Sequence, residues 1–378
     1  MSAYLDNSAT TKPCEECVSA VVNMLTDNFG NASSLHDLGI KAMKEIILAR
    51  GAVADSLGVD KDEIIFTSGA TEANNMVLFG SARAKGRLGK RIVTTAIEHE
   101  SVLQSAQQLE KQGFEVIYLE PDSRGNITEK QLFDAVNKDT ILVSMMYINN
   151  EVGTIEPIYQ IGKIAREKQI LFHTDAVQAY AQIPLSVNYY PVDLLSASAH
   201  KFHGPKGVGF LYIRDGIDIP SFIHGGSQER GKRAGTENVA GIVGMAKAAE
   251  IAYGNMRKRV QKEIMLRNYL IERVMHEIPD AKLNGHRSIR LPGNVNFSFK
   301  GLEGASLLIL LDEDGICASG GSACNTGEER ISYVIKALGV PEEYAPGTIR
   351  ITLCGDTTRA DVDAALVSLK RNIAVLRG

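Results

Sequence analysis

The chain has 378 residues, of which 44% are hydrophobic and 23% are charged, a balance typical of a globular protein with roughly two domains. The net charge of −4 at pH 7 gives no electrostatic reason to expect nucleic-acid binding, and no apolar run reaches the ~20 residues that span a bilayer. The first residues lack the basic and apolar parts of a signal peptide, so we expect a cytoplasmic protein with no membrane partner.

Five cysteines are too few for a disulfide framework, and an odd number leaves at least one unpaired. Cys14 and Cys17 form a lone C-x-x-C in a segment, 13–25, that predicts an amphipathic helix. A zinc site would need two further ligands at suitable spacing, and the sequence offers no second pair. A redox or metal module built on these two thiols therefore remains only an alternative. Cys317 lies in an apolar run, and we expect it to be buried.

From about residue 60 to 215, apolar strand-like segments alternate with helical ones. Strands are predicted at 64–67, 91–95, 115–119, 140–148, 170–174, 192–196 and 208–213, and helices at 101–112, at 158–168 and from Thr71 onward. This alternation implies an α/β fold with a largely parallel sheet covered by helices on both faces.

The character of the chain changes after about residue 235. The pattern over 240–278 predicts one long helix, or two joined near Gly254. Beyond it, strands at 294–299 and 348–352 mix with helices at 304–312, 331–338 and 359–371, which indicates a smaller α+β domain. We place the large domain at 13–254 and the small one at 1–12 together with 255–378.

Polar residues follow the predicted strands where ligands bind in such sheets. The turn that opens the helix at Ala70 and Thr71 has free backbone N–H groups and a hydroxyl, which would suit a phosphate, although a simple helix cap would look the same. His99, the pair of asparagines ending at Asn150, and Asp175 with Gln178 follow later strands.

The segment SASAHK at 196–201 places Lys201 at the end of a further strand. A lysine amine forms Schiff bases with carbonyl groups, and its pKa falls readily when it is desolvated. Lysine, phosphate turn, histidine, acid and glutamine together match what pyridoxal 5′-phosphate (PLP) needs from a protein. A surface lysine after a strand is the simpler interpretation of Lys201 alone.

At this point the sequence resembles the cysteine desulfurases of the NifS/IscS type, which are class V aminotransferases with the fold type I of PLP enzymes. The matching segments are YLDNSATTKP at 4–13, TSGATE at 67–72, EH at 98–99, NNE at 149–151, TDAVQ at 174–178, AHK at 199–201, GPKG at 204–207, GGSQER at 225–230, RAGTEN at 233–238 and GGSAC at 320–324. The resemblance implies a large domain with a mainly parallel seven-stranded sheet between helices, plus a smaller α+β domain.

The resemblance also implies roles for individual residues. Lys201 would hold PLP as a Schiff base and move the Cα proton of the substrate, and His99 would stack on the ring and assist proton transfer. Asp175 would pair with the pyridinium nitrogen and Gln178 with the phenolate oxygen. The phosphate would be held by Ala70, Thr71, Ser198 and His200, with Thr236 contributed by the partner subunit of a homodimer. Asn150, which also borders the cofactor, would receive the substrate carboxylate together with Arg350.

Cys324 lies in a small, polar, glycine-rich segment that predicts an exposed loop, where a thiol is accessible for chemistry. The resemblance implies that this thiol takes the sulfur of L-cysteine as a persulfide, releases L-alanine and carries the sulfur to an acceptor. An alternative role of the same thiol is as a ligand of a metal cluster. Twelve residues separate Cys324 from Ala337, which resembles the longer-loop group that works with an iron–sulfur scaffold or a tRNA-thiolation enzyme.

Two departures from the family pattern leave the named groups in place. After Arg350 the family often has Ser-Leu-Gly, whereas this chain has TLC at 352–354, so Cys354 lies close to the active site, either as packing or as a second thiol that resolves a persulfide. Ser227 replaces a third glycine. Two other functions remain as alternatives. One is a different fold type I PLP enzyme, such as an aminotransferase or selenocysteine lyase, and the other is a non-enzymatic sulfur-relay or scaffold protein.

Overall fold

A computed structural model describes residues 3–320 and 331–378. At its centre is a seven-stranded sheet in the order β2 (Ile64–Thr67), β8 (Gly209–Ile213), β7 (Leu194–Ser198), β6 (Leu171–Asp175), β5 (Thr140–Ser144), β3 (Arg91–Thr95) and β4 (Glu115–Leu119). β8 runs antiparallel to both of its neighbours, and the other neighbouring pairs are parallel. The mainly parallel seven-stranded sheet predicted from the sequence is therefore confirmed.

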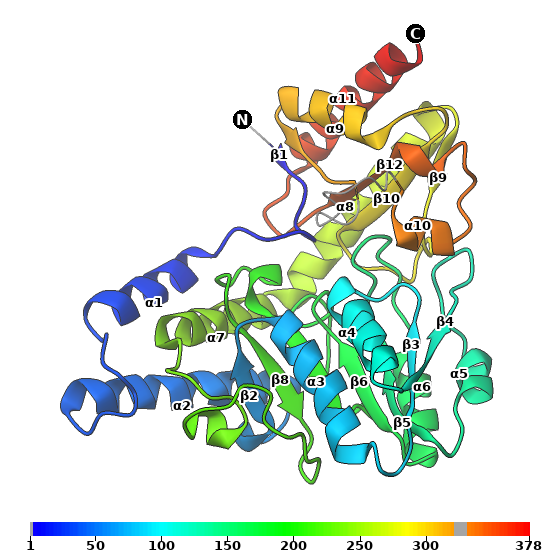
Figure 1. Cartoon of the computed structure of the whole chain (residues 1–378). Coiled ribbons are helices and arrows are strands. Elements are labelled where there is room, and N and C mark those ends of the chain that lie inside the picture. Colours follow the sequence, from blue (N-terminus) through cyan, green and yellow to red (C-terminus); the bar gives the residue numbers. More distant parts are fainter. Residues whose placement is uncertain (1–2, 321–330) are drawn as a thin grey trace.

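Helices cover both faces of this sheet. Successive residues of a strand point to opposite faces, so both faces of the sheet carry apolar side chains that must be covered. Ile64 and Phe66 belong to one buried cluster, whereas Ile65 between them belongs to the other. Figure 1 shows α3 (Ala70–Lys85) and α4 (Glu100–Lys111) across the near face. The other cluster includes residues of α1 (Glu15–Thr26), α2 (Asp37–Leu57), α5 (Glu129–Ala135), α6 (Ile158–Glu167) and α7 (Val239–Gly254).

A second, smaller part lies above the sheet in Figure 1. It contains an antiparallel sheet in the order β12 (Thr348–Thr352), β10 (Asn294–Phe299), β9 (Ala281–Leu283), and a parallel pair of β1 (Ala3–Tyr4) and β11 (Ile316–Cys317). Its helices are α8 (Met256–Glu277), α9 (Gly304–Glu313), α10 (Tyr333–Ala337) and α11 (Arg359–Arg377).

The hydrophobic core of this smaller part is separate from the two clusters of the large sheet. It combines Ala3 and Leu5 of the N-terminal segment with apolar residues from 266 to 373. A small cluster around Ile97, Val152 and Val334 joins the two parts close to the carboxyl-terminal end of β3. The separate cores support a division at residues 12/13 and 254/255, which stays a prediction.

Two predicted strands have other bounds in the structure. The predicted strand 140–148 ends at Ser144, because the backbone N–H of Met146 turns away to donate to the carboxylate of Glu98. The strand predicted at 192–196 lies two residues later, at Leu194–Ser198. The helical pattern over 240–278 is two helices, α7 and α8, separated at Asn255, which confirms the alternative of two helices joined near Gly254. None of the helices within 3–320 and 331–378 is long and apolar enough to cross a membrane.

Candidate active site

A cavity of about 500 Å³ opens where the parallel strands of the large sheet end. Its walls come from the segments after β2, β3, β5, β6 and β7, from the N-terminal segment and from β12. The predicted site residues that line it are Ala70, Thr71, His99, Asn150, Asp175, Gln178, Ser198, His200, Lys201 and Arg350.

One described residue of the predicted site is not in this wall, and a second predicted residue is not described by the structure. Thr236 is exposed on the surface and does not line the cavity. Cys324 lies outside the described residues, so its placement stays a prediction.

Lys201 ends a short 3-10 helix, Ala199–Lys201, that directly follows β7. Its Nζ donates to the backbone oxygens of Ser8 at 2.6 Å and Ala9 at 2.9 Å. Gln178 Nε2 donates to the same Ser8 oxygen at 3.0 Å. The N-terminal segment thus contacts two of the predicted cofactor ligands, a contact that the sequence analysis did not anticipate although residues 4–13 belong to the family pattern.

Asp175 ends β6 and is held by two donors. Asn74 Nδ2 donates to its Oδ2 at 2.8 Å, and the Val177 backbone N–H donates to its Oδ1 at 3.0 Å. Asp175 is only 5% exposed, so a dry site surrounds an oriented carboxylate. A carboxylate of this kind is what a protonated ring nitrogen needs as a partner.

His99 is the N-cap of α4, and this position determines which ring nitrogen carries the proton. The Ser101 backbone N–H donates to His99 Nδ1 at 3.1 Å, and Ser101 Oγ lies 2.9 Å from the same atom. A nitrogen that accepts from a backbone N–H has no proton of its own. The neutral imidazole therefore carries its proton on Nε2.

The part of the cavity wall at the start of α3 suits an anion. α3 begins after Gly69, whose φ of 151° is a conformation that side chains disfavour, and no side chain caps this helix. The uncapped N–H groups near Ala70 and Thr71 are therefore available to an oxyanion. A Cβ at Gly209 would lie 2.4 Å from the Ala197 oxygen and 2.8 Å from Gly69 Cα, so only glycine allows β8 to pass this turn.

His200 also lines the cavity, and its Nδ1 lies 3.2 Å from Thr10 Oγ1. Burial, and then the nearby charges of Lys201 and Lys206, lower its pKa to about 4. Because this is well below 7, the ring is neutral near physiological pH and can both donate and accept hydrogen bonds.

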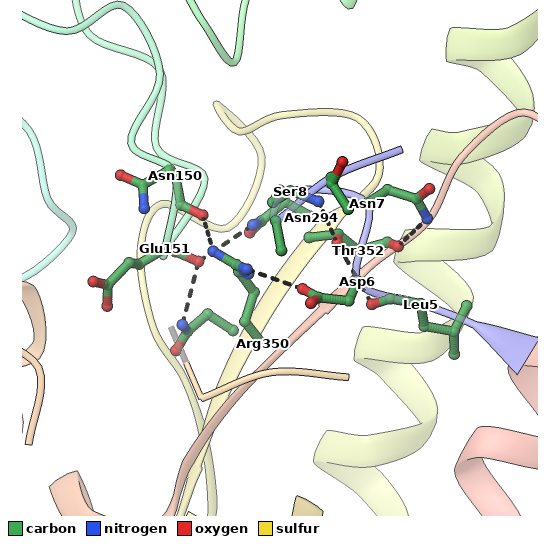
Figure 2. Close-up of polar contacts among 12 residues, drawn as sticks. Leu5, Asp6, Asn7, Ser8, Asn150, Glu151, Asn294, Arg350 and Thr352 are labelled. Carbon is green, nitrogen blue, oxygen red and sulfur yellow. Dashed lines mark hydrogen bonds and ion pairs between the residues drawn. The ribbon is translucent and has the colours of Figure 1, made fainter. Parts of the chain in front are cut away.

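Arg350 extends from β12 toward the cavity, and its surroundings are drawn in Figure 2. It is 1% exposed, donates from Nη1 to the Asn150 backbone oxygen at 2.8 Å, and forms an ion pair through Nη2 with Asp6 Oδ1 at 2.9 Å. Within the described part of the chain, Arg350 Nε and Asn150 Oδ1 are buried without a hydrogen-bond partner. Buried polar atoms are costly to leave unpaired, so these two atoms point to a bound polar ligand.

The two asparagines of the predicted polar turn have different positions. Asn149 is fully buried, and its Oδ1 accepts from the backbone N–H groups of Glu151 and Val152, both at 2.9 Å. It therefore stabilises the turn, whereas Asn150 lines the cavity.

Glu98 is a buried acid that directly precedes His99 in the sequence, and the sequence analysis assigned no role to it. Its Oε1 accepts from Thr95 Oγ1 at 2.8 Å and from the Met146 backbone N–H at 2.9 Å. Burial raises its pKa to about 8, and the charge of Asp175 acts in the same direction. Glu98 is therefore mostly protonated near neutral pH.

The described cysteines are free thiols and contribute nothing to the cavity wall. Burial raises the pKa of Cys17 to about 11, so this thiol stays protonated and unreactive at neutral pH. Cys317 is only half-buried, so the expectation that it is buried was wrong: the strand β11 that carries it pairs only with the short β1. In the segments 3–320 and 331–378 no group of three His, Cys, Asp or Glu side chains is placed to hold a metal.

Comparison with known proteins identifies the family. The model of the aminotransferase class-V family matches residues 3–365. "Cysteine desulfurase IscS" of Dictyoglomus turgidum is 50% identical over 99% of this chain and 95% of its own length. Among solved structures, "NIFS-LIKE PROTEIN" is 40% identical with a TM-score of 0.94, covering 100% of both chains, and "SspA in complex with cysteine" is 33% identical with a TM-score of 0.83, covering 94% of this chain and 100% of its own.

Enzymes of this family use PLP, and the cavity has groups that fit this cofactor. The uncapped start of α3 offers N–H groups to a phosphate, Asp175 offers an oriented carboxylate, and Lys201 offers an amine. The fold, the cavity and the similarity over nearly its whole length agree, and the chain belongs to the class V aminotransferase family, among the cysteine desulfurases of the NifS/IscS type.

Proposed function

We propose that this protein binds PLP at Lys201, removes sulfur from L-cysteine and transfers it to Cys324. The observation that carries the proposal is the single cavity that gathers ten predicted site residues around the amine of Lys201. Three features of this cavity support the proposal: uncapped N–H groups that suit an anion, the oriented carboxylate of Asp175 and the amine of Lys201.

The substrate carboxylate is assigned to Arg350 and Asn150. Arg350 is buried and charged, and its Nε faces no partner among the described residues, so a carboxylate can pair with it in place of water. A related solved structure, 33% identical, is described as a complex with cysteine. This supports L-cysteine as the amino acid that the cavity accepts.

The proposed chemistry divides the work among three side chains. When bound, PLP supplies an electron sink that weakens the bond between Cβ and sulfur of the substrate. The amine of Lys201 moves the Cα proton, and Nε2 of His99 holds a proton that can be donated during the reaction. The Cys324 thiolate attacks the substrate sulfur, the Cβ–S bond breaks, and the carbon skeleton takes up a proton and leaves as L-alanine, so that Cys324 keeps the sulfur as a persulfide.

The proposal is tested with the purified protein and L-cysteine. We expect stoichiometric L-alanine, sulfide release in the presence of a thiol reductant, and an absorbance of lysine-bound PLP that Cys324→Ala retains while sulfide release is lost. Desulfuration retained by Cys324→Ala would contradict the persulfide step. Faster turnover of L-selenocysteine, or transfer of an amino group to a 2-oxoacid, would favour the alternative PLP enzymes. Colourless protein would favour a sulfur-relay or scaffold role.

We further propose a homodimer in which Thr236 completes the phosphate site of the partner subunit. Thr236 is exposed and lies outside its own cavity wall. An exposed apolar surface runs along α1, the following loop and α2, and it includes Val18, Val22, Leu25, Phe29, Leu35, Ile40, Ile47 and Leu48. Leu35 is 94% exposed, and an apolar surface of this extent is typical of an interface.

A second copy of the chain is the proposed occupant because this surface adjoins residues that precede and follow Thr236 in the sequence. A second cavity is lined by Met43 and Ile47 of α2 together with Gln228 and Glu237. Light scattering tests the assignment: Leu25→Lys with Ile47→Lys should give a monomer. The matched control, Val367→Lys with Val375→Lys on α11, should stay dimeric, since those side chains are similarly exposed but lie on the smaller part. Dimers from both double variants would contradict the assignment.

The sulfur acceptor that we propose is a protein, either an iron–sulfur scaffold or a tRNA-thiolation enzyme, that receives the persulfide sulfur directly. The cytoplasm is the proposed location, because the free thiols of Cys14, Cys17, Cys317 and Cys354 are typical of a reducing compartment.

A further inference from the structure

Asn74 connects Asp175 and His99, to which we assign different roles at the PLP ring. It lies on α3, one turn after Thr71, and is fully buried. Its Nδ2 donates one hydrogen to Asp175 Oδ2 and the other to Ser101 Oγ, both at 2.8 Å. The Ser101 oxygen in turn lies 2.9 Å from His99 Nδ1. A continuous chain of hydrogen bonds therefore runs from Asp175 to His99.

The direction of each hydrogen bond in this chain is determined. Asp175 can only accept, so the Asn74 amide must turn its nitrogen toward it. The same nitrogen donates its second hydrogen to Ser101 Oγ, which leaves the hydroxyl proton of Ser101 free to point at His99 Nδ1. That nitrogen already accepts from the Ser101 backbone N–H. Both donors therefore favour the imidazole form that has its proton on Nε2.

We propose that Asn74 is a positioning residue that, through Ser101, couples the orientation of the Asp175 carboxylate to the proton position on His99. The inference rests on the proposed function, in which Asp175 and His99 act on PLP. Asn74 does not line the cavity, so it acts through its two neighbours. The surroundings are dry, since Asn74, Ser101 and Asp175 are each at most 8% exposed, and hydrogen bonds to a charged group are strong there.

Packing alone does not explain this residue. Asn74 Oδ1 is buried without a partner among the described residues, which an apolar side chain at this position would avoid. What the amide supplies is two donated hydrogens in fixed directions. Without them, Asp175 keeps the Val177 N–H as its remaining donor among the described residues, and the Ser101 hydroxyl is free to rotate away from His99.

The experiment uses the PLP-loaded protein with ¹⁵N-labelled histidine, and His99→Gln identifies the His99 signals. In the wild type, Nδ1 of His99 should have the chemical shift of an unprotonated acceptor and Nε2 that of a protonated nitrogen. In Asn74→Ala and in Ser101→Ala the chemical shifts of Nδ1 and Nε2 of His99 should move toward each other. Both variants lose steady donation from the Ser101 hydroxyl to Nδ1, so the form with its proton on Nε2 is less favoured. The double variant should shift no further than either single variant, since both changes break one chain. Ser101→Thr, which keeps the hydroxyl, should restore the wild-type shifts.

A second readout is retention of PLP on dialysis. The affinity of Asn74→Ala for PLP should be about 10- to 100-fold lower than that of the wild type, because a hydrogen bond to a buried charge is lost. Ser81→Ala is the matched control, because Ser81 is buried on the same helix and its hydroxyl has no partner in the described part of the chain. It should change neither readout.

Unchanged His99 shifts and unchanged PLP retention in Asn74→Ala would overturn the inference, while leaving the proposed function intact. A wild-type protein that binds no PLP would instead refute the proposed function. If Asn74→Ala does not fold, Ser101→Ala and Ser101→Thr decide the question: equal shifts in both would contradict the coupling, and a shift in the alanine variant alone would support it.

Discussion

The ion pair between Asp6 and Arg350 gives the sharpest stability prediction. Arg350 is 1% exposed, and Asp6 Oδ1 lies 2.9 Å from its Nη2. Asp6→Asn keeps an oxygen that can accept a hydrogen bond but removes the charge that balances the buried guanidinium. Breaking a buried pair costs about 3 to 5 kcal/mol, and we expect the lower limit, about 3 kcal/mol, because Asp6 retains some contact with water.

The assay is differential scanning calorimetry of the PLP-loaded protein. An unfolding entropy of about 2 cal/mol/K per residue over 378 residues converts about 3 kcal/mol into a decrease of about 4 °C in Tm. Asp134→Asn is the matched control, since its partner Lys130 and Asp134 itself are largely exposed, and such pairs contribute less than about 1 kcal/mol. If Asp6→Asn shifts Tm no more than Asp134→Asn, then Asp6 does not balance the charge of Arg350, and the assignment of this corner of the cavity is wrong.

Three further predictions concern single groups. Burial raises the pKa of Glu98 to about 8, so the folded protein holds a proton that the unfolded chain releases; the contribution of Glu98 to stability should fall by roughly 1.4 kcal/mol per pH unit between about pH 4.5 and about pH 8. Glu98→Gln should flatten this dependence in urea titrations across that range, and an unchanged slope would contradict a neutral Glu98. Lys201→Ala should lack the absorbance of lysine-bound PLP and produce no sulfide, with an unchanged circular dichroism spectrum; residual turnover would exclude Lys201 as the essential amine. Replacing Cys14 and Cys17 by alanine should leave sulfide release unchanged, and a large loss would revive the redox or metal alternative.

Most strands of the large sheet were predictable because they are short apolar runs buried on both faces, as in β2, β5 and β6, whereas the edge strand β4 is partly exposed. Asp175 ends β6 and Lys201 ends the short 3-10 helix after β7, and their meeting in one cavity follows from parallel strands ending at the same edge of the sheet. The resemblance added Arg350, whose role no periodicity indicates, and assigned Gln178 to the phenolate oxygen.

Other features depend on tertiary contacts that the sequence pattern does not contain. The helix α2 was not predicted, because it carries apolar residues on two sides and so lacks a single apolar stripe. Ala42 and Ile46 are buried, whereas Ile40 and Ile47 are exposed. Asn74 looks like an ordinary polar helix residue until α4 and β6 bring Ser101 and Asp175 within 2.8 Å of it.

The contact between the N-terminal segment and Lys201 joins residues more than 190 positions apart, and it uses backbone oxygens that no side-chain motif reports. The only sequence signal that could have found it is the match of residues 4–13 to the family pattern.

Mass spectrometry of the protein after incubation with L-cysteine tests the central claim most directly. The account predicts that the peptide containing Cys324 gains the mass of one sulfur atom, that a thiol reductant removes this mass, and that the Lys201→Ala variant never acquires it. L-alanine produced by a protein whose Cys324 peptide stays unmodified, or a persulfide found on Cys354 instead, would contradict the claim that sulfur passes from substrate to Cys324.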